Sequence, residues 1–284
     1  MPMPATAADD APRACPHCRV PMVQCRLHAH TGPSVHIDHC AACRLVWFDT
    51  LESVHLSGLG WVELLRELSR GEGQPPVAPR PPALGCPVCT GPLKTVHNRT
   101  RWGRFPMQEC PLGHGHVHSN AGLLAERGLV RPLLPAERGA LRAHQRVLHC
   151  LSCGAVVEGE GDGEACTWCT SPLLVIDLPR LAHALRQRGP DGEPTPLADG
   201  VPLRWPCHAC GHTLDPTLAA ACPQCGAGVL APAISDLQPL LDTAEHELLA
   251  AANHPARPNK RVAHGPRTWR DTHLARLLRW LRPD

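Results

Sequence analysis

The chain has 284 residues and a formal net charge of +2, with two Phe and no Tyr against 32 Pro and 24 Gly. This composition leaves too few large side chains to build one sizeable core, and no stretch approaches the ~18 apolar residues of a membrane-spanning helix. We therefore expect small folded units that need a source of stability besides hydrophobic burial. The 16 cysteines indicate what that source is.

The N-terminus, residues 1–13, has neither a basic start nor an apolar run. It predicts a disordered segment and no secretory signal. We therefore expect a cytoplasmic location. In such a reducing compartment, closely spaced cysteines bind metal more often than they form disulfides.

All cysteines except Cys25 fall into four sets built on C-x2-C pairs. A C-x-x-C turn aims two thiolates at one point, and two such turns complete a tetrahedron around Zn²⁺. Four protein ligands leave no position for water, so such a site is structural rather than catalytic. The four predicted zinc sites are Cys15, Cys18, Cys40 and Cys43; Cys86, Cys89, Cys110 and His114; Cys150, Cys153, Cys166 and Cys169; and Cys207, Cys210, Cys222 and Cys225.

Other interpretations of these sets stay open. Disulfides need an oxidising compartment, and neighbouring C-x-x-C pairs are poorly placed to cross-link distant segments. An iron site of the rubredoxin kind would have few aromatic side chains to shield it. In the second set Gly113 aligns with Cys43 and His114 follows one residue later, so His116 is a rival for the fourth ligand.

Residues 14–70 are expected to form a ribbon of short strands followed by a helix. Trp47 and Phe48 end the last strand, where one or both are expected to cover the cysteines and pack against the helix. Asp49 with Glu52 matches a capping box. The CPHC pair, the hairpin, CAAC and VWFD together resemble the bacterial TFIIB-type zinc ribbon, also called the transcription factor zinc-finger domain. The resemblance implies a zinc site on the four cysteines of the first set. It does not by itself imply a role in transcription.

The same order of strand, polar cap and short helix recurs after the other three sets. The expected caps are Ser119, Asp177 and the pair Ser235 and Gln238. The second unit resembles a diverged copy of the first, and the third and fourth resemble short generic zinc ribbons of prokaryotic proteins. The expected segments are a Pro-rich linker at 71–85, ribbon 2 with helices at 86–148, ribbon 3 with a helix at 149–187, a linker at 188–204, ribbon 4 with a helix at 205–252, and a linker at 253–267.

Several residues of the first two ribbons have no role in the predicted zinc sites. Cys25 lies on a strand with no partner at ligand spacing, which predicts a small buried side chain or a free thiol. His116 and His118 are expected to be surface or packing residues. Four histidines of the first hairpin suggest either a second metal site or solvated strand residues. They are His28, His30, His36 and His39.

The C-terminal segment 268–284 predicts an amphipathic basic helix. One stripe is leucine-rich, and the other holds Trp269, His273, Arg276 and Trp280, residue types that are enriched at interface hot spots. We predict that this second stripe binds a partner. The competing interpretations are that both stripes pack on the ribbons or that the helix binds a membrane surface.

The charge distribution limits the function classes. With fifteen thiolates and four Zn²⁺, the formal charge falls from +2 to −5; residues 255–284 contribute +6, so the rest is near −11. We find no nucleophile–base–acid pattern, phosphate loop or dinucleotide fingerprint. The sequence thus predicts a small metal-stabilised α+β array of four zinc ribbons, not an enzyme, acting as an adaptor or scaffold for a protein partner. The alternative is a nucleic-acid-binding or transcription-associated protein that uses the basic tail.

Overall fold

The structure is a computed structural model. It describes residues 12–30, 32, 34–49, 55–74, 77–78, 80–81, 83–100, 103–157, 164–187, 204–216 and 218–253. The described residues up to Ala252 belong to one compact unit. The predicted helix at 268–284, with Trp269, His273, Arg276 and Trp280, lies outside the described residues.

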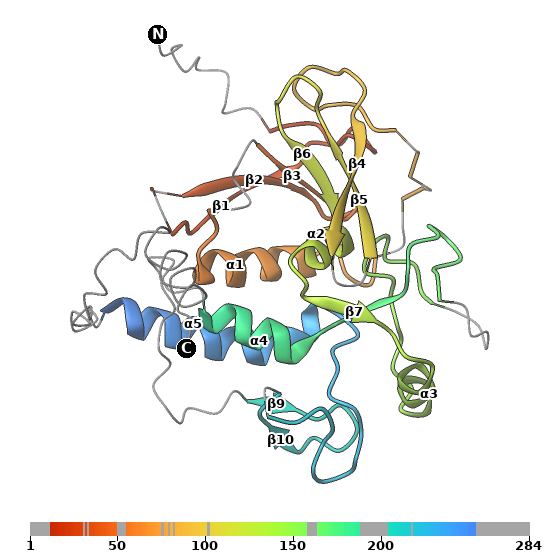
Figure 1. The fold of residues 1–284 in the computed structure, drawn as a ribbon, viewed down its shortest axis with the longest axis vertical. Helices are drawn as coiled ribbons and strands as arrows, with labels where there is room; N and C mark the ends of the chain where they lie inside the picture. Colours follow the sequence, from red (N-terminus) through yellow and green to blue (C-terminus); the bar gives the residue numbers. More distant parts are fainter. Residues whose placement is uncertain are drawn as a thin grey trace, which may run out of the picture. The chain divides into compact units, whose positions relative to one another are not determined.

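One six-stranded antiparallel sheet joins the first two cysteine-rich units (Figure 1). Its order is β1-β2-β3-β6-β5-β4, so the last strand of each unit pairs with the other at the centre. Leu45 lies opposite Ser119 and Phe48 opposite His116, which relates the two halves by an approximate two-fold axis. The strands are β1 (Val23–Leu27), β2 (Val35–Cys40), β3 (Leu45–Phe48), β4 (Lys94–Thr100), β5 (Gly103–Glu109) and β6 (His116–Ser119).

The central strand β3 separates two kinds of packing. Because successive side chains of a strand point to opposite faces, Val46 and Phe48 join the cluster that contains the helices. Leu45 and Trp47 instead pack with cysteines of the first two sets. The prediction that the two aromatic residues cover the cysteines and seat the helix is confirmed, with one residue for each task.

The remaining elements complete the compact unit. α1 packs against strands of the sheet and against α4 (Figure 1). Arg66 of α1 bonds to Asp242 and Glu245 of α5. β7 pairs with β8, and β9 pairs with β10. The elements are α1 (Gly58–Ser69), α2 (Asn120–Glu126), β7 (Val130–Pro132), α3 (Pro135–Ala143), β8 (Leu174–Ile176), α4 (Leu178–Gln187), β9 (Trp205–Pro206), β10 (Thr213–Leu214), the 3-10 turn Ser235–Leu237 and α5 (Gln238–Asn253).

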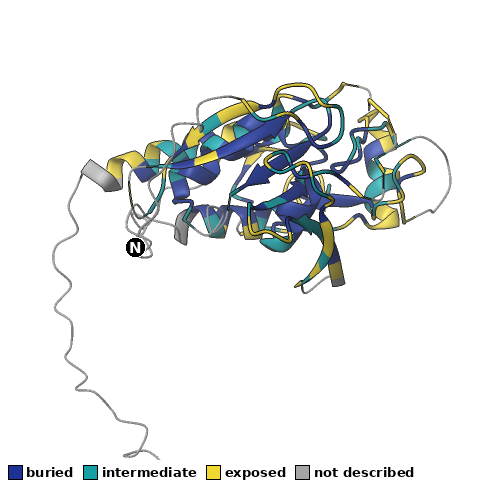
Figure 2. Ribbon diagram, turned by 90° about the horizontal axis from the view of Figure 1, so that it is seen from above, coloured by how far each residue is buried: buried dark blue, intermediate teal, exposed yellow. Residues whose placement is uncertain are grey.

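The expectation that the chain lacks a sizeable core was wrong. One buried cluster runs from Leu27 through the helices to Leu248, and Leu64, Leu65 and Leu68 of α1 are fully buried within it. Figure 2 shows buried residues on strands and helices alike. Leucines from several short helices fill this core, so the scarcity of aromatic residues did not prevent it from forming.

Two of the predicted helix caps are confirmed. Ser119 Oγ accepts a hydrogen bond from Gly122 N at 3.0 Å, and Asp177 Oδ1 accepts one from Arg180 N at 3.3 Å. Each thereby satisfies one of the unpaired N–H groups in the first turn of its helix.

The other two predicted caps are wrong. α1 begins at Gly58, where Ser57 Oγ accepts from Gly60 N, and Asp49 instead bonds to Arg13 and to Trp47 Nε1. The second is Ser235, which lies within the 3-10 turn that precedes α5 and is not a capping residue, and Gln238 is the first residue of α5. There the carboxylate of Glu72, beyond the end of α1, accepts hydrogen bonds from Ile234 N and Ser235 N, at 2.6 Å each.

Candidate metal centres

Six of the seven C-x-x-C pairs lie on turns that share one hydrogen-bond pattern; in the Cys40–Cys43 turn Arg44 N donates to Ala41 O instead. In the first, Cys15 N donates to Val20 O at 2.8 Å and Arg19 N donates to Cys15 O at 3.0 Å. The same two bonds recur in the turns that begin at Cys86, Cys150, Cys166, Cys207 and Cys222. The residue after the second ligand has a positive φ at Arg19, Arg44, Thr90, Gly154, Thr170, Gly211 and Gly226. The sequence C-x-x-C-G in three of these turns is a signal for this geometry that the sequence analysis did not use.

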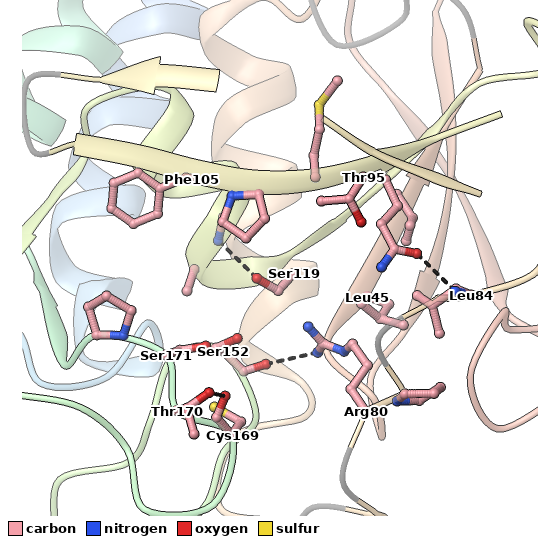
Figure 3. A pocket seen from close by; sticks show the side chains of 18 of the residues that line it. Leu45, Arg80, Leu84, Thr95, Phe105, Ser119, Ser152, Cys169, Thr170 and Ser171 are labelled. Atoms are coloured by element: carbon pink, nitrogen blue, oxygen red, sulfur yellow. Dashed lines mark hydrogen bonds between the residues drawn. The ribbon is translucent and has the colours of Figure 1, made fainter. Parts of the chain in front are cut away.

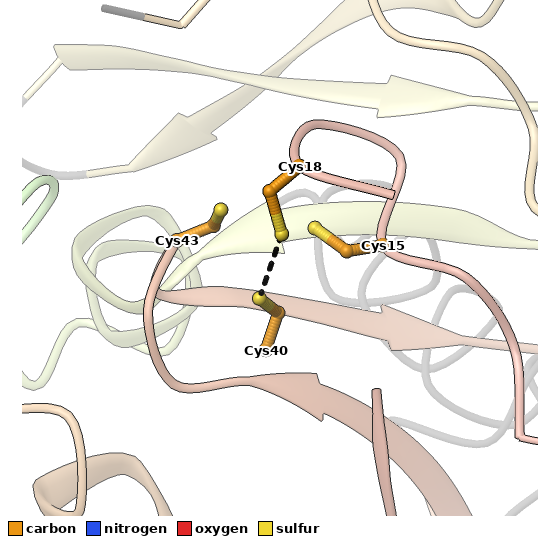
Figure 4. A group of neighbouring side chains, drawn as sticks. All are labelled: Cys15, Cys18, Cys40 and Cys43. Carbon is orange, nitrogen blue, oxygen red and sulfur yellow. Dashed lines mark hydrogen bonds between the residues drawn. The ribbon is translucent and has the colours of Figure 1, made fainter. Parts of the chain in front are cut away.

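Each of the four predicted sets converges on one point. The ligand atoms of each set all lie within 4.8 Å of one another, and Figure 4 shows Cys15, Cys18, Cys40 and Cys43 gathered from two turns. Six sulfur–sulfur pairs, at least one in each set, are 3.6 to 3.7 Å apart. A tetrahedron with Zn–S bonds of ~2.3 Å has an edge of about 3.8 Å, whereas a disulfide bond is about 2.05 Å long. The donor sets therefore fit a four-coordinate metal ion.

In the second set the structure brings His114, not His116, to the cysteines. His114 Nδ1 lies 3.3 Å from Cys110 Sγ and 3.9 Å from Cys86 Sγ. The turn holds one residue more than a C-x-x-C turn, and Gly115, at φ 137°, passes so close to β3 that a Cβ there would lie 2.2 Å from Phe48 O. His116 instead stacks on Phe48, with ring centroids 5.6 Å apart.

We expect His114→Ala to remove one metal equivalent per chain and His116→Ala to remove none. The first substitution leaves three ligands, whereas the second removes a ring that packs on Phe48. Metal analysis of the two purified variants beside the wild type tests this. Loss of metal from the His116 variant alone would show that the ligand assignment is wrong.

The crowded thiols of the first group shift one another's pKa values. Hydrogen bonds from Cys40 and Cys43 lower the pKa of Cys15 to about 2, and donation to Cys15 raises the pKa of Cys40 to about 12. Without a metal, the first group would therefore share protons around one thiolate. A bound dication displaces those protons and holds all four sulfurs as thiolates.

The four groups differ in exposure. Two cysteines of the fourth group, Cys210 and Cys225, are exposed, whereas every residue of the first and third groups is buried or half-buried. The fourth group is therefore the most accessible to chelators and thiol reagents.

The histidines of the first hairpin are not a further metal site in the described residues, where only the four groups above meet the ligand geometry. His39 is fully buried, with Nδ1 3.1 Å from Glu67 Oε1, so the expectation of a solvated residue was wrong there. His28 Nδ1 lies 2.7 Å from Glu63 Oε1. In β6, His118 is buried, which confirms its expected packing role.

Cys25 belongs to none of the four groups. It is half-buried, and burial, followed by the charge of Glu67, raises the pKa of its thiol to about 12. A raised pKa keeps the thiol neutral at physiological pH, so we expect slow alkylation of Cys25 in the metal-loaded protein. Between pH 8 and 10 the rate should rise about tenfold per unit without levelling, because the thiolate fraction grows that way below the pKa. Mass spectrometry of the labelled peptide measures this; a plateau near pH 9 would contradict it.

A groove of about 540 Å³ lies between the β4–β5 hairpin and the last turn of the third group (Figure 3). Its walls include Phe105, Met107 and Trp168. Ser119 Oγ and Gln108 Oε1 in the groove accept hydrogen bonds from backbone N–H groups. The described lining includes Ser and Cys side chains but no His, Asp or Glu that could act as a general base beside them.

No family model, curated protein or solved structure matches the chain. The fold and the donor sets define a small α+β protein with four zinc-ribbon-like groups, two of them joined through one sheet. The resemblance of residues 14–70 to the TFIIB-type ribbon rests on the sequence motif alone. No helix in the described ranges has the length and apolar character needed to cross a bilayer.

Proposed function

We propose that this protein is a zinc-stabilised adaptor or scaffold with four structural Zn²⁺ sites and no catalytic activity. The observation that carries the proposal is the closure of each group by four protein ligands within 4.8 Å. A tetrahedral ion held in this way has no open position for a substrate or an activated water. Bound zinc cross-links two short turns, and the small ribbons need this cross-link for their stability.

Zinc is the metal that the donors favour. Thiolate-rich tetrahedral sites select zinc or iron–sulfur centres, and the Cys3His donor set of the second group is a common structural zinc set. A reducing location such as the cytoplasm agrees with closely spaced thiols that lie 3.6 to 3.7 Å apart rather than being bonded.

A protein partner is favoured by the charge distribution. With its metal bound, the part of the chain before residue 255 carries a formal charge near −11, which repels nucleic acid. The alternative is a nucleic-acid-binding or transcription-associated protein, and the observation in its favour is the +6 charge of residues 255–284.

The double change Trp269→Ala and Trp280→Ala tests the partner-binding stripe. We expect zinc content and melting temperature to stay at wild-type values while partner capture from the native host falls severalfold. Trp168→Ala removes an exposed tryptophan from the ribbon body and serves as the matched control. Capture that is equal in all three proteins would contradict the proposal. Capture that disappears with nuclease and declines steeply with salt would establish the nucleic-acid alternative.

A further inference from the structure

Arg44 is a buried cation between the first and third cysteine groups. It directly follows Cys43, and only 2% of its surface is exposed. Its guanidinium donates to Cys153 O at 2.7 Å, and to Gly71 O and Gln74 O at 2.6 and 3.2 Å. A side chain that starts at one metal-binding turn therefore ends on the turn of another.

Arg80 makes a second connection between the same two turns. Its Nη2 donates to Cys43 O at 3.2 Å and to Ser152 O at 3.3 Å, and Figure 3 shows the bond to Ser152. Its Nε is buried without a hydrogen-bond partner in the described residues. The segment that sequence analysis assigned to a linker thus places a guanidinium group between two metal centres.

The metal-binding turn of the third group has a glycine where the Arg44 side chain approaches it. Gly154 follows Cys153 at φ 81°, and a Cβ at this position would lie 1.8 to 2.0 Å from guanidinium atoms of Arg44. Any side chain there would displace the arginine. The glycine therefore serves both the turn and the close approach of a cation.

Most of the negative charges that face these arginines are cysteine sulfurs, with Glu72 second to Cys153 among the charges that face Arg44. Within the described ranges neither guanidinium forms an ion pair with a carboxylate, and the Glu72 carboxylate is bonded to Ile234 N and Ser235 N. Burial lowers the pKa of both arginines; Cys153 is the largest opposing charge for Arg44, and Cys169 for Arg80. A buried charge needs a counter-charge, and Zn²⁺ with four thiolates carries a formal charge of −2.

We propose that Arg44 and Arg80 are counter-cations shared by the first and third zinc sites, so that these two sites hold and release metal as a coupled pair. The inference rests on the proposed function, because a charge of −2 at each of the two sites exists only when that site binds a dication. The coupling has a structural route. Arg44 is fixed by the Cys40–Cys43 turn, so metal loss from the first site withdraws the guanidinium from Cys153 O.

The test is time-resolved alkylation of the metal-loaded, full-length protein in excess chelator, with the rate of each cysteine peptide read by mass spectrometry. In the wild type, the first and third groups should be labelled at one common rate, and the exposed fourth group faster. Arg44→Met and Arg80→Met should each accelerate both groups about tenfold or more, the usual size of an outer-shell effect on metal affinity. Neither should alter the fourth group.

Two further variants separate charge from packing. Arg66→Met removes an arginine that pairs with Asp242 and Glu245 of α5, and it should leave all metal-release rates unchanged. Arg80→Lys keeps the positive charge and should restore most of the wild-type rate.

Separate rates for the two groups in the wild type would overturn the proposal, even if no variant folds. Acceleration of only one group in Arg44→Met or Arg80→Met would overturn it as well. A wild-type protein without zinc would instead refute the proposed function.

Discussion

Replacing Cys40 by Ser should unfold the whole compact unit and not only the first ribbon. Metal binding to structural zinc sites contributes roughly 10–16 kcal/mol in small peptides, whereas a domain has a net stability of about 5–15 kcal/mol. Cys40 ends β2, whose neighbour β3 pairs with β6 of the second ribbon. Losing the first site therefore removes the support of the six-stranded sheet and of the core beneath it.

Circular dichroism during heating, combined with metal analysis, measures this effect. Cys25→Ser is the matched control, because Cys25 lies on the adjacent strand opposite Ile37 and belongs to no metal group. The control should keep its full metal content and a cooperative transition. A Cys40→Ser protein that retains three zinc ions and melts near the wild-type temperature would show that the ribbons are independent.

Trp47→Ala should be the most destabilising substitution outside the ligands themselves. Trp47 is fully buried among cysteines of the first two groups, and its Nε1 donates to Asp49 Oδ1 at 2.9 Å. Truncating a buried Trp to Ala costs about 3–5 kcal/mol, which corresponds to a fall of about 10 °C in melting temperature for a unit of this size.

Trp168→Ala is the control for this second prediction, since Trp168 is 45% exposed and a surface substitution changes stability by only about 0.5 kcal/mol. Differential scanning calorimetry of both zinc-loaded variants makes the comparison. Equal melting temperatures would mean that Trp47 does not contribute to the core as described.

The cysteine groups could be predicted from sequence because their geometry is local. Each C-x-x-C turn is built by hydrogen bonds within five residues of the first cysteine. The strand Leu45–Phe48 could be predicted because a short apolar run lies between a metal ligand and a polar residue.

The connections between groups could not be predicted in this way, because they depend on contacts between distant segments. Nothing in the run HVHS of β6 indicates that it pairs with β3, and two of its residues are histidines that pack around Phe48. Arg80 lies in the segment that was predicted to be a Pro-rich linker, yet its side chain donates hydrogen bonds to Cys43 O and Ser152 O. The start of α1 was misplaced because Asp49 offers a good cap locally, whereas its carboxylate pairs with Arg13.

Metal content of the purified full-length protein is the most direct test of the central claim that each cysteine-rich group holds a structural zinc ion. Elemental analysis, with protein concentration determined independently, gives the number of ions per chain. We predict four zinc ions, one for each group of four ligands, and no iron. Two or fewer zinc ions per chain, or iron in their place, would contradict the account.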